Sequence, residues 1–148
     1  MNPYIQIAAA FFGSLGFAML FNLRGLWLFF TALGGCLSWC IYLLIGCFIN
    51  HYEWQYFAAA FFLGIYSEIM ARKTKSPSTL YLAVGMIPLI PGAALYYTMQ
   101  NAVLKNFQIC ADRGLESLIT GGAIASGIIT AMVCWNVTKF HLIKKLNF

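Results

Sequence analysis

Charged side chains are scarce in this sequence: Asp, Glu, Lys and Arg make up only 9% of its 148 residues, against about 25% in soluble domains. Hydrophobic residues make up 61%. This composition excludes a soluble globular domain and an enzyme that needs a charge-rich cleft. The excess of nine Lys and Arg over four Asp and Glu therefore indicates membrane topology rather than nucleic-acid binding.

Cysteine pairs and histidine clusters are also missing. The five cysteines contain no CxxC pair, and Cys36, Cys40 and Cys47 share one helix face, where we expect them to be packing residues rather than soft-metal ligands. His51 and His141 form no metal cluster, and no P-loop, HExxH or GxSxG motif is present. The sequence therefore predicts no enzyme activity, no metal site and no cofactor.

The amino end has no positively charged region before its first apolar stretch, since the first basic residue is Arg24. A cleavable signal peptide needs such a region. We therefore expect the first apolar stretch to remain as a membrane helix.

Five apolar stretches are separated by polar residues, and a spanning helix needs about 20 apolar residues. The sequence predicts an all-α integral membrane protein with about five transmembrane helices. An alternative with four spans would make the fourth stretch re-entrant. The expected spans are residues 5–21, 26–49, 54–71, 79–100 and 117–137, so that 1–137 is the membrane domain and 138–148 a basic cytoplasmic tail.

The positions of the basic residues set the expected orientation, because cytoplasmic loops carry an excess of Lys and Arg. With five spans, two cations lie on one side, Lys105 and Arg113. Seven lie on the other side: Arg24, Arg72, Lys73, Lys75, Lys139, Lys144 and Lys145. This predicts a multi-pass protein of the plasma membrane, with its amino end outside and its carboxyl tail in the cytoplasm, held there by anionic lipid.

The fourth stretch contains the strongest local signal, the run from Gly85 to Gly92 with Pro88 and Pro91 inside it. Each proline lacks an N–H, so an unbroken helix would release the carbonyls of Val84 and Ile87. Broken backbone survives in a membrane only inside protein or beside a water-filled cavity, and transporters use such helices near the midplane. The alternative is a kinked helix with a purely geometric role.

Glu68 is the one acidic residue well inside an apolar stretch, and such residues are candidates for proton relays. Ala60, Gly64, Glu68 and Arg72 recur every four residues, so Glu68 is expected to face protein or a cavity. An ion pair with Arg72 is an equal alternative.

Small residues four apart occur in other stretches too, which indicates close helix packing and favours burial of some faces against another chain, including a second copy. The clearest examples are Ala9 and Gly13; Thr31 and Gly35; Gly34 and Ser38; Gly121 and Ala125; and Gly122, Ser126 and Thr130.

The sequence resembles the small-subunit type of the threonine/serine exporter family, which matches the carboxyl-terminal membrane half of the full-length exporters. The resemblance runs through residues 16–22, 53–54, 67–72 and 75–79, and its most specific part is IPLIPG at 87–92 followed by YYTM at 96–99. It implies export of a small polar metabolite, either a hydroxy amino acid or a dicarboxylate. It also implies a partner, a longer membrane subunit that carries the amino-terminal half.

These features together predict a half-transporter driven by an ion or proton gradient, with a non-transporting assembly or regulatory subunit as the alternative. A membrane-embedded enzyme is disfavoured because no catalytic motif is present. The expected path residues are Asn22, Glu68, Val84, Ile87, Pro88, Pro91, Gly92 and Tyr96, with Arg72 and Lys75 at the cytoplasmic mouth.

Overall fold

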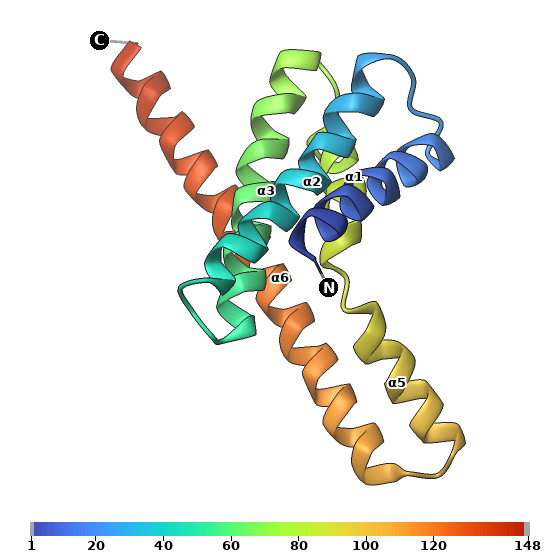
Figure 1. Cartoon of the computed structure of the whole chain (residues 1–148). Coiled ribbons are helices and arrows are strands. Elements are labelled where there is room, and N and C mark those ends of the chain that lie inside the picture. Colours follow the sequence, from blue (N-terminus) through green and yellow to red (C-terminus); the bar gives the residue numbers. More distant parts are fainter. Residues whose placement is uncertain (1, 147–148) are drawn as a thin grey trace.

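The computed structural model describes residues 2–146, with side chains for 2–139, and this part of the chain is helical without strands. Figure 1 shows a bundle of helices from which the hairpin of α5 and the first half of α6 projects. In chain order the elements are α1 (Pro3–Leu20), α2 (Leu26–Gly46), α3 (Tyr52–Thr74), α4 (Ser78–Gly85), the 3-10 helix η1 (Ile87–Leu89), α5 (Gly92–Val103) and α6 (Phe107–Leu146).

Three helices are long and apolar enough to cross a bilayer, namely α1, α2 and the Phe107–Lys139 part of α6. The segments Ser78–Leu89 and Gly92–Val103 pass the same test together, but they are bent by 60° and form a fourth, broken span or a re-entrant loop. These findings confirm an all-α membrane protein with a broken fourth stretch. α3, the third of the five expected spans, has 23 residues but is not among these candidates, because Gln55, Glu68 and its tyrosines lower its hydropathy. Among the described residues the structure therefore supports three or four of the five expected spans.

α6 extends beyond the expected fifth span at both ends. It is a single helix of 40 residues, which at 1.5 Å per residue is about 60 Å long, twice the hydrocarbon thickness of about 30 Å. The expected outer loop therefore contains the first turns of α6, where Arg113 and Glu116 form an ion pair at 2.8 Å. The tail begins as helix as well, but the side chains from residue 140 onward, to which we assigned lipid binding, lie outside the described residues.

Three helices end with a residue in the left-handed conformation, which closes the last turn. In each case the N–H of the following residue donates to the carbonyl five positions earlier, as in the Schellman motif. The left-handed residues are Asn22, Lys75 and Lys105, and the closing bonds are Leu23 to Ala18 (3.1 Å), Ser76 to Ala71 (3.0 Å) and Asn106 to Asn101 (2.9 Å).

The closest helix contact joins α3 and α6 through residues with small side chains. A Cβ added at Gly127 would lie 2.6 Å from the backbone oxygen of Phe57, and one added at Gly64 would lie 2.6 Å from Ala131 Cβ. Ala60 and Gly64 belong to the stripe identified in the sequence, and this stripe faces α6. Small residues allow such close approach, which favours packing between membrane helices.

Some of the other small residues lie in close helix contacts, and others have no described neighbour beside them. Gly34 lies against the ring of Tyr66, and Gly35 lies against Ser14, so α2 is packed tightly on both sides. Gly13, Gly121 and Gly122 have no heavy atom within 4 Å of an added Cβ. Within the described residues, these three glycines therefore do not mediate close helix packing.

We predict that Gly127→Ala destabilises the protein, because the new methyl group meets the backbone of α3 rather than a flexible side chain. Overpacking of this kind costs about 1–3 kcal/mol. Thermal unfolding of the purified chain in detergent measures this loss. Gly122→Ala is the matched control on the same helix, where the methyl group enters open space and Ala's higher helix propensity adds up to about 1 kcal/mol. Equal midpoints for the two variants would contradict the close α3–α6 contact.

Candidate functional site

The fourth stretch is interrupted between Gly85 and Gly92 in two steps. α4 ends at Gly85 and gives way to η1, in which the Leu89 N–H donates to the Met86 carbonyl at 2.9 Å. Ile90 is extended, and Pro91 has φ −75° and ψ 61°, the values of an inverse γ-turn. The Gly92 N–H closes that turn on the Ile90 carbonyl at 2.7 Å, and α5 starts there. The two missing proline donors therefore produce a change of direction rather than a kink within one helix.

The carbonyls near the break find partners in the protein. An unbroken helix would release the Ile87 carbonyl, but here it accepts the Ile90 N–H at 3.3 Å in the tighter 3-10 geometry. The Met86 N–H is directed to the carbonyls of Leu82 and Val84. The Gly85 carbonyl lies 3.3 Å from the hydroxyl oxygen of Ser38 on α2, which is also 2.8 Å from the Gly35 carbonyl. α2 thus supplies to the interrupted backbone a side-chain donor whose one hydrogen is shared with the Gly35 carbonyl.

The break packs on α1 and α2 at one shared point. A Cβ added at Gly35, near the middle of α2, would overlap the hydroxyl oxygen of Ser14 and lie 3.5 Å from Pro88 Cγ. Ser14 has no exposed surface. The absence of a side chain at Gly35 therefore allows α1, α2 and η1 to meet near the middle of the α2 crossing.

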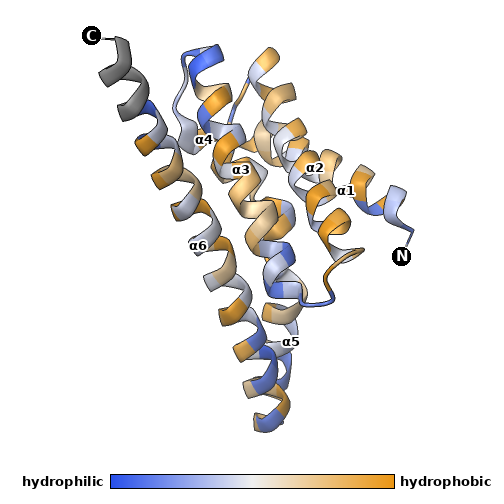
Figure 2. Ribbon diagram, turned by 90° about the vertical axis from the view of Figure 1, so that its left-hand side faces the viewer, coloured by the Kyte–Doolittle hydropathy of each residue, from blue (hydrophilic) through white to orange (hydrophobic). Residues whose placement is uncertain are grey.

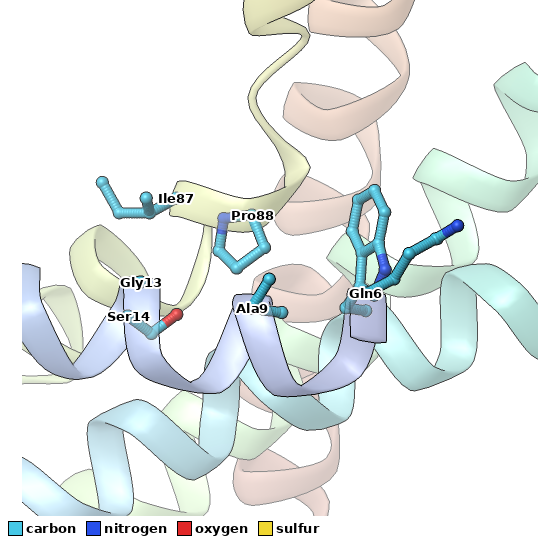
Figure 3. A pocket seen from close by; sticks show the side chains of 8 residues that line it. Gln6, Ala9, Gly13, Ser14, Ile87 and Pro88 are labelled. Atoms are coloured by element: carbon cyan, nitrogen blue, oxygen red, sulfur yellow. The ribbon is translucent and has the colours of Figure 1, made fainter. Parts of the chain in front are cut away.

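A cavity of about 500 Å³ opens beside this junction. Figure 3 shows Pro88 and Ile87 on one side of it, with Gln6, Ala9 and Ser14 along α1 on the other. Two buried polar atoms near the cavity, Ser14 Oγ and Trp39 Nε1, have no hydrogen-bond partner among the described residues. Buried polar groups are nearly always paired, so these two atoms are the polar groups beside the cavity that a bound water or a polar solute would satisfy. The lining residues are Gln6, Ala9, Ala10, Gly13, Ser14, Trp39, Ile87 and Pro88.

Comparison with known families identifies the family to which the chain belongs. The family model described as Threonine/Serine exporter, ThrE, matches residues 6–134. This chain belongs to the threonine/serine exporter family. No solved structure matches it. The resemblance seen in the sequence is thereby confirmed, and membership in an exporter family makes the chain a membrane transport protein.

Only two of the path residues expected in this exporter line the cavity, namely Ile87 and Pro88. Val84 is fully buried in a small apolar cluster with Ala18 and Leu23. Pro91 lines a second, apolar groove of about 410 Å³ between the break and α6. The double-proline break therefore contacts two separate spaces, and only the one beside α1 has polar groups of the kind a solute needs.

Three other expected path residues lie outside the cavity. Asn22 ends α1 with φ 56° and is exposed. Gly92 is exposed at the start of α5. Tyr96 is 62% exposed and lies edge-on to Tyr97, with ring centres 5.5 Å apart. An unbroken helix would place Tyr96 roughly on the same side as Pro88, but the 60° bend separates the two segments and removes that shared face.

Glu68 and Arg72 form an ion pair near the end of α3, at 3.6 Å between Oε2 and Nη2. The Arg72 guanidinium lies 4.6 Å from the ring centre of Trp135 on α6. Neither residue lines the cavity at the break. The ion pair is the second of the two interpretations that the sequence left open. Lys75, the other expected mouth residue, ends α3 in the left-handed conformation and is exposed.

Sequence reasoning missed the α1 and α2 side of the site. Ala9 and Gly13 were noted only as packing residues, and Gln6, Ser14 and Trp39 were not considered. Gln6 and Ser14 are polar residues within the first apolar stretch, which was the available signal. Trp39 gave no signal, because a tryptophan inside an apolar helix is usually a packing residue.

We predict that Ser38→Ala weakens the attachment of the break to α2, because the Gly85 carbonyl loses its side-chain donor. A buried acceptor without a partner costs about 1–3 kcal/mol, which is measurable as a lower midpoint of thermal unfolding. Ser126→Ala is the matched control, since the Ser126 hydroxyl is exposed and donates to the Ala123 carbonyl of its own helix at 3.0 Å. Equal stability of the two variants would show that the Ser38 hydroxyl does not hold the break.

Proposed function

We propose that this chain is a half-transporter subunit that exports a small polar metabolite, a hydroxy amino acid or a dicarboxylate, through the cavity at the broken helix. Family membership gives membrane transport of the threonine/serine type. The observation that carries the proposal is the juxtaposition of the Pro88 break with two unpaired polar atoms, on Ser14 and Trp39, at one cavity.

The size and depth of the cavity support a solute site. Ligand cavities usually measure about 300–1,000 Å³, and this one measures about 500 Å³. The helix break beside the cavity contacts α2 at Gly35, near the middle of the helix Leu26–Gly46. Transporters bind their substrates at discontinuous helices near the bilayer midplane.

The chemistry of the lining supports a solute with oxygen acceptors. The Trp39 indole N–H donates only, and the Ser14 hydroxyl both donates and accepts. A carboxylate accepts from both groups, and a solute hydroxyl pairs with Ser14 in either direction. Pairing these atoms removes the cost of leaving them unsatisfied, about 1–3 kcal/mol each, so the solute gains affinity without any charged residue in the wall.

The open side of the cavity supports a companion chain. Ala9 and Gly13 line the cavity but are themselves exposed, and no heavy atom lies within 4 Å of an added Cβ at Gly13. We propose that a longer membrane subunit, carrying the amino-terminal half of the exporter, covers this face of α1 and completes the path. A second copy of this chain is the alternative occupant.

The distribution of polar residues supports the orientation that the sequence predicts. Figure 2 shows hydrophilic residues at the α3–α4 turn and again at the opposite end near the α5–α6 turn, with apolar helix between them. Arg72, Lys73 and Lys75 lie at the first end and Lys105 at the second. We therefore propose that the α3–α4 turn is cytoplasmic and that the protein belongs to the plasma membrane.

An ion or proton gradient is the proposed driving force, since the sequence has no nucleotide-binding motif. Glu68 is the proposed coupling carboxylate, because it is the acidic residue within the apolar part of α3 and its side chain is only 21% exposed. Arg72 and Lys75, at the cytoplasmic end of α3, would draw anionic solutes toward the chain.

An assembly or regulatory subunit remains the second candidate, supported by the open faces of α1 and α6. In that case the companion chain alone forms the path. Glu68→Gln and Pro91→Ala separate the two functions. Intact complexes that have lost flux support a transporting half, whereas complexes that fail to assemble support the second candidate.

We predict that Ser14→Ala and Trp39→Phe each raise KM for efflux by about two- to tenfold, the loss expected for one hydrogen bond worth about 0.5–1.5 kcal/mol. Cells that express both subunits are loaded with labelled threonine, serine or succinate, and the solute whose efflux requires this chain is used for the kinetics. Matched controls are Ser126→Ala and Trp54→Phe, whose side chains are exposed and lie outside the cavity. Unchanged KM in complexes that co-purify normally would refute the assignment of the cavity.

We predict that Glu68→Gln abolishes the dependence of efflux on the proton gradient, because an amide cannot take up and release the coupled proton. Efflux is measured at fixed solute load while the gradient is varied with an ionophore. Glu116→Gln, which breaks the exposed ion pair to Arg113, is the matched control. Gradient-dependent efflux that survives Glu68→Gln would assign Glu68 to the ion pair with Arg72 alone.

A further inference from the structure

A third pocket, which shares no lining residue with the two spaces at the broken helix, lies between the end of α3 and the Trp135–Lys139 turn of α6. It is small, about 90 Å³, and is lined by Arg72, Trp135, Thr138 and Lys139. Two of its four residues are cationic, and Glu68 is the acidic partner of Arg72. The pocket therefore carries more positive than negative charge.

The Arg72 guanidinium contacts two neighbouring side chains, but its hydrogen-bond donors are not all occupied by acceptors among the described residues. It lies 4.6 Å from the centre of the Trp135 ring, a distance typical of a cation–π contact. Its contact with Glu68 is 3.6 Å, which is beyond hydrogen-bond distance. Arginine has five N–H donors, and no hydrogen bond from Arg72 is formed within the part of the chain that the structure describes. A planar fork of donors is thus positioned at the pocket and available to an oxyanion.

The other walls add donors and charge. Lys139 is exposed at the rim, and Thr138 presents a hydroxyl that donates to the Cys134 carbonyl at 2.8 Å and can still accept. The indole N–H of Trp135 is buried and has no partner among the described residues. A phosphate or phosphodiester group offers acceptor oxygens to the Lys139 ammonium and to the unpaired Trp135 indole N–H.

The place of the pocket indicates where the ligand comes from. Arg72 is two residues from the end of α3, beside the basic α3–α4 turn, which is the end of the bundle that we assign to the cytoplasmic surface. Basic pockets between membrane helices on that side bind anionic lipid headgroups. The volume of about 90 Å³ accommodates such a group but lies well below the usual range for a whole solute.

We propose that Arg72, Trp135, Thr138 and Lys139 form a binding site for a phosphate oxyanion, supplied by the headgroup of an anionic phospholipid. The ligand joins the end of α3 to α6 and neutralises Arg72 and Lys139. This site is separate from the cavity at Pro88, and it does not depend on the proposed transport function.

The test is ligand titration of the full-length chain in a neutral detergent, followed by its midpoint of thermal unfolding. We expect dioctanoyl phosphatidylglycerol to raise the midpoint by about 3–6 °C at ten times its Kd. Dioctanoyl phosphatidylcholine has the same acyl chains but no net charge, and it should leave the midpoint unchanged. Inorganic phosphate separates the sources, since a shift with the lipid alone supports the headgroup and an equal shift with phosphate assigns the site to the free anion.

Variants test whether these residues form the site. Arg72→Gln with Lys139→Gln should weaken binding of phosphatidylglycerol about tenfold or more. Lys73→Gln removes the same charge from the same turn of α3 but does not line the pocket, so its affinity should change less than twofold. Lys139→Gln alone, at an exposed position with no described partner, provides a second variant if the double variant does not fold. Undiminished affinity in these variants, or equal stabilisation by phosphatidylcholine, would overturn the proposal.

Discussion

Backbone groups inside a membrane have no water to bond with, and this constraint governs the centre of the chain. Pro88 and Pro91 remove two N–H donors from the fourth apolar stretch. A 3-10 turn and an inverse γ-turn form at the break, and the Ser38 hydroxyl of α2 donates a hydrogen bond to the Gly85 carbonyl. The break is therefore stable only where another helix lies close enough to help, and Gly35 provides that approach.

The same close approach creates the cavity beside α1. η1 packs on α1 and α2 at Ser14 and Gly35. After this contact the backbone changes direction toward α5, and a cavity remains beside α1. The α3–α6 pair, packed through Gly64 and Gly127, is a second contact in which small side chains bring two helices close together. In an exporter of this family, the arrangement places the interrupted helix between this tightly packed pair and the open face of α1.

Much of the fold could be predicted from the sequence, because the relevant signals are local. Low charge and long apolar runs predict membrane helices, and two prolines with a glycine predict a break. The small residues of α3 predicted a closely packed neighbouring helix but not that this helix is α6. A repeat of four residues identifies the packing face of one helix and not the helix that packs on it. The first turns of α6 were expected to be a loop because they are polar, yet the Arg113–Glu116 pair is compatible with a helix.

The candidate site was predicted only on one side. Ile87 and Pro88 were predicted because a proline in the sequence shows directly that one backbone N–H is missing. Ser14 and Trp39 were missed, because being buried without a partner is a property of the packed structure and not of the residue type. Tyr96 was assigned to the path by helical periodicity, and that argument fails once the helix is interrupted, since residues on either side of a 60° bend no longer share a face.

The sequence by itself determined that the chain is an all-α membrane protein of the exporter family, interrupted at Pro88 and Pro91, because composition and missing backbone donors are fixed by covalent structure. The packing of the helices was needed to learn that Ser38 contacts the Gly85 carbonyl and which helix faces enclose the cavity. Helix packing also brings Trp135 of α6 beside Arg72 of α3. These outcomes depend on distances between segments far apart in the chain, and such distances are set by how closely glycine and serine let the helices pack.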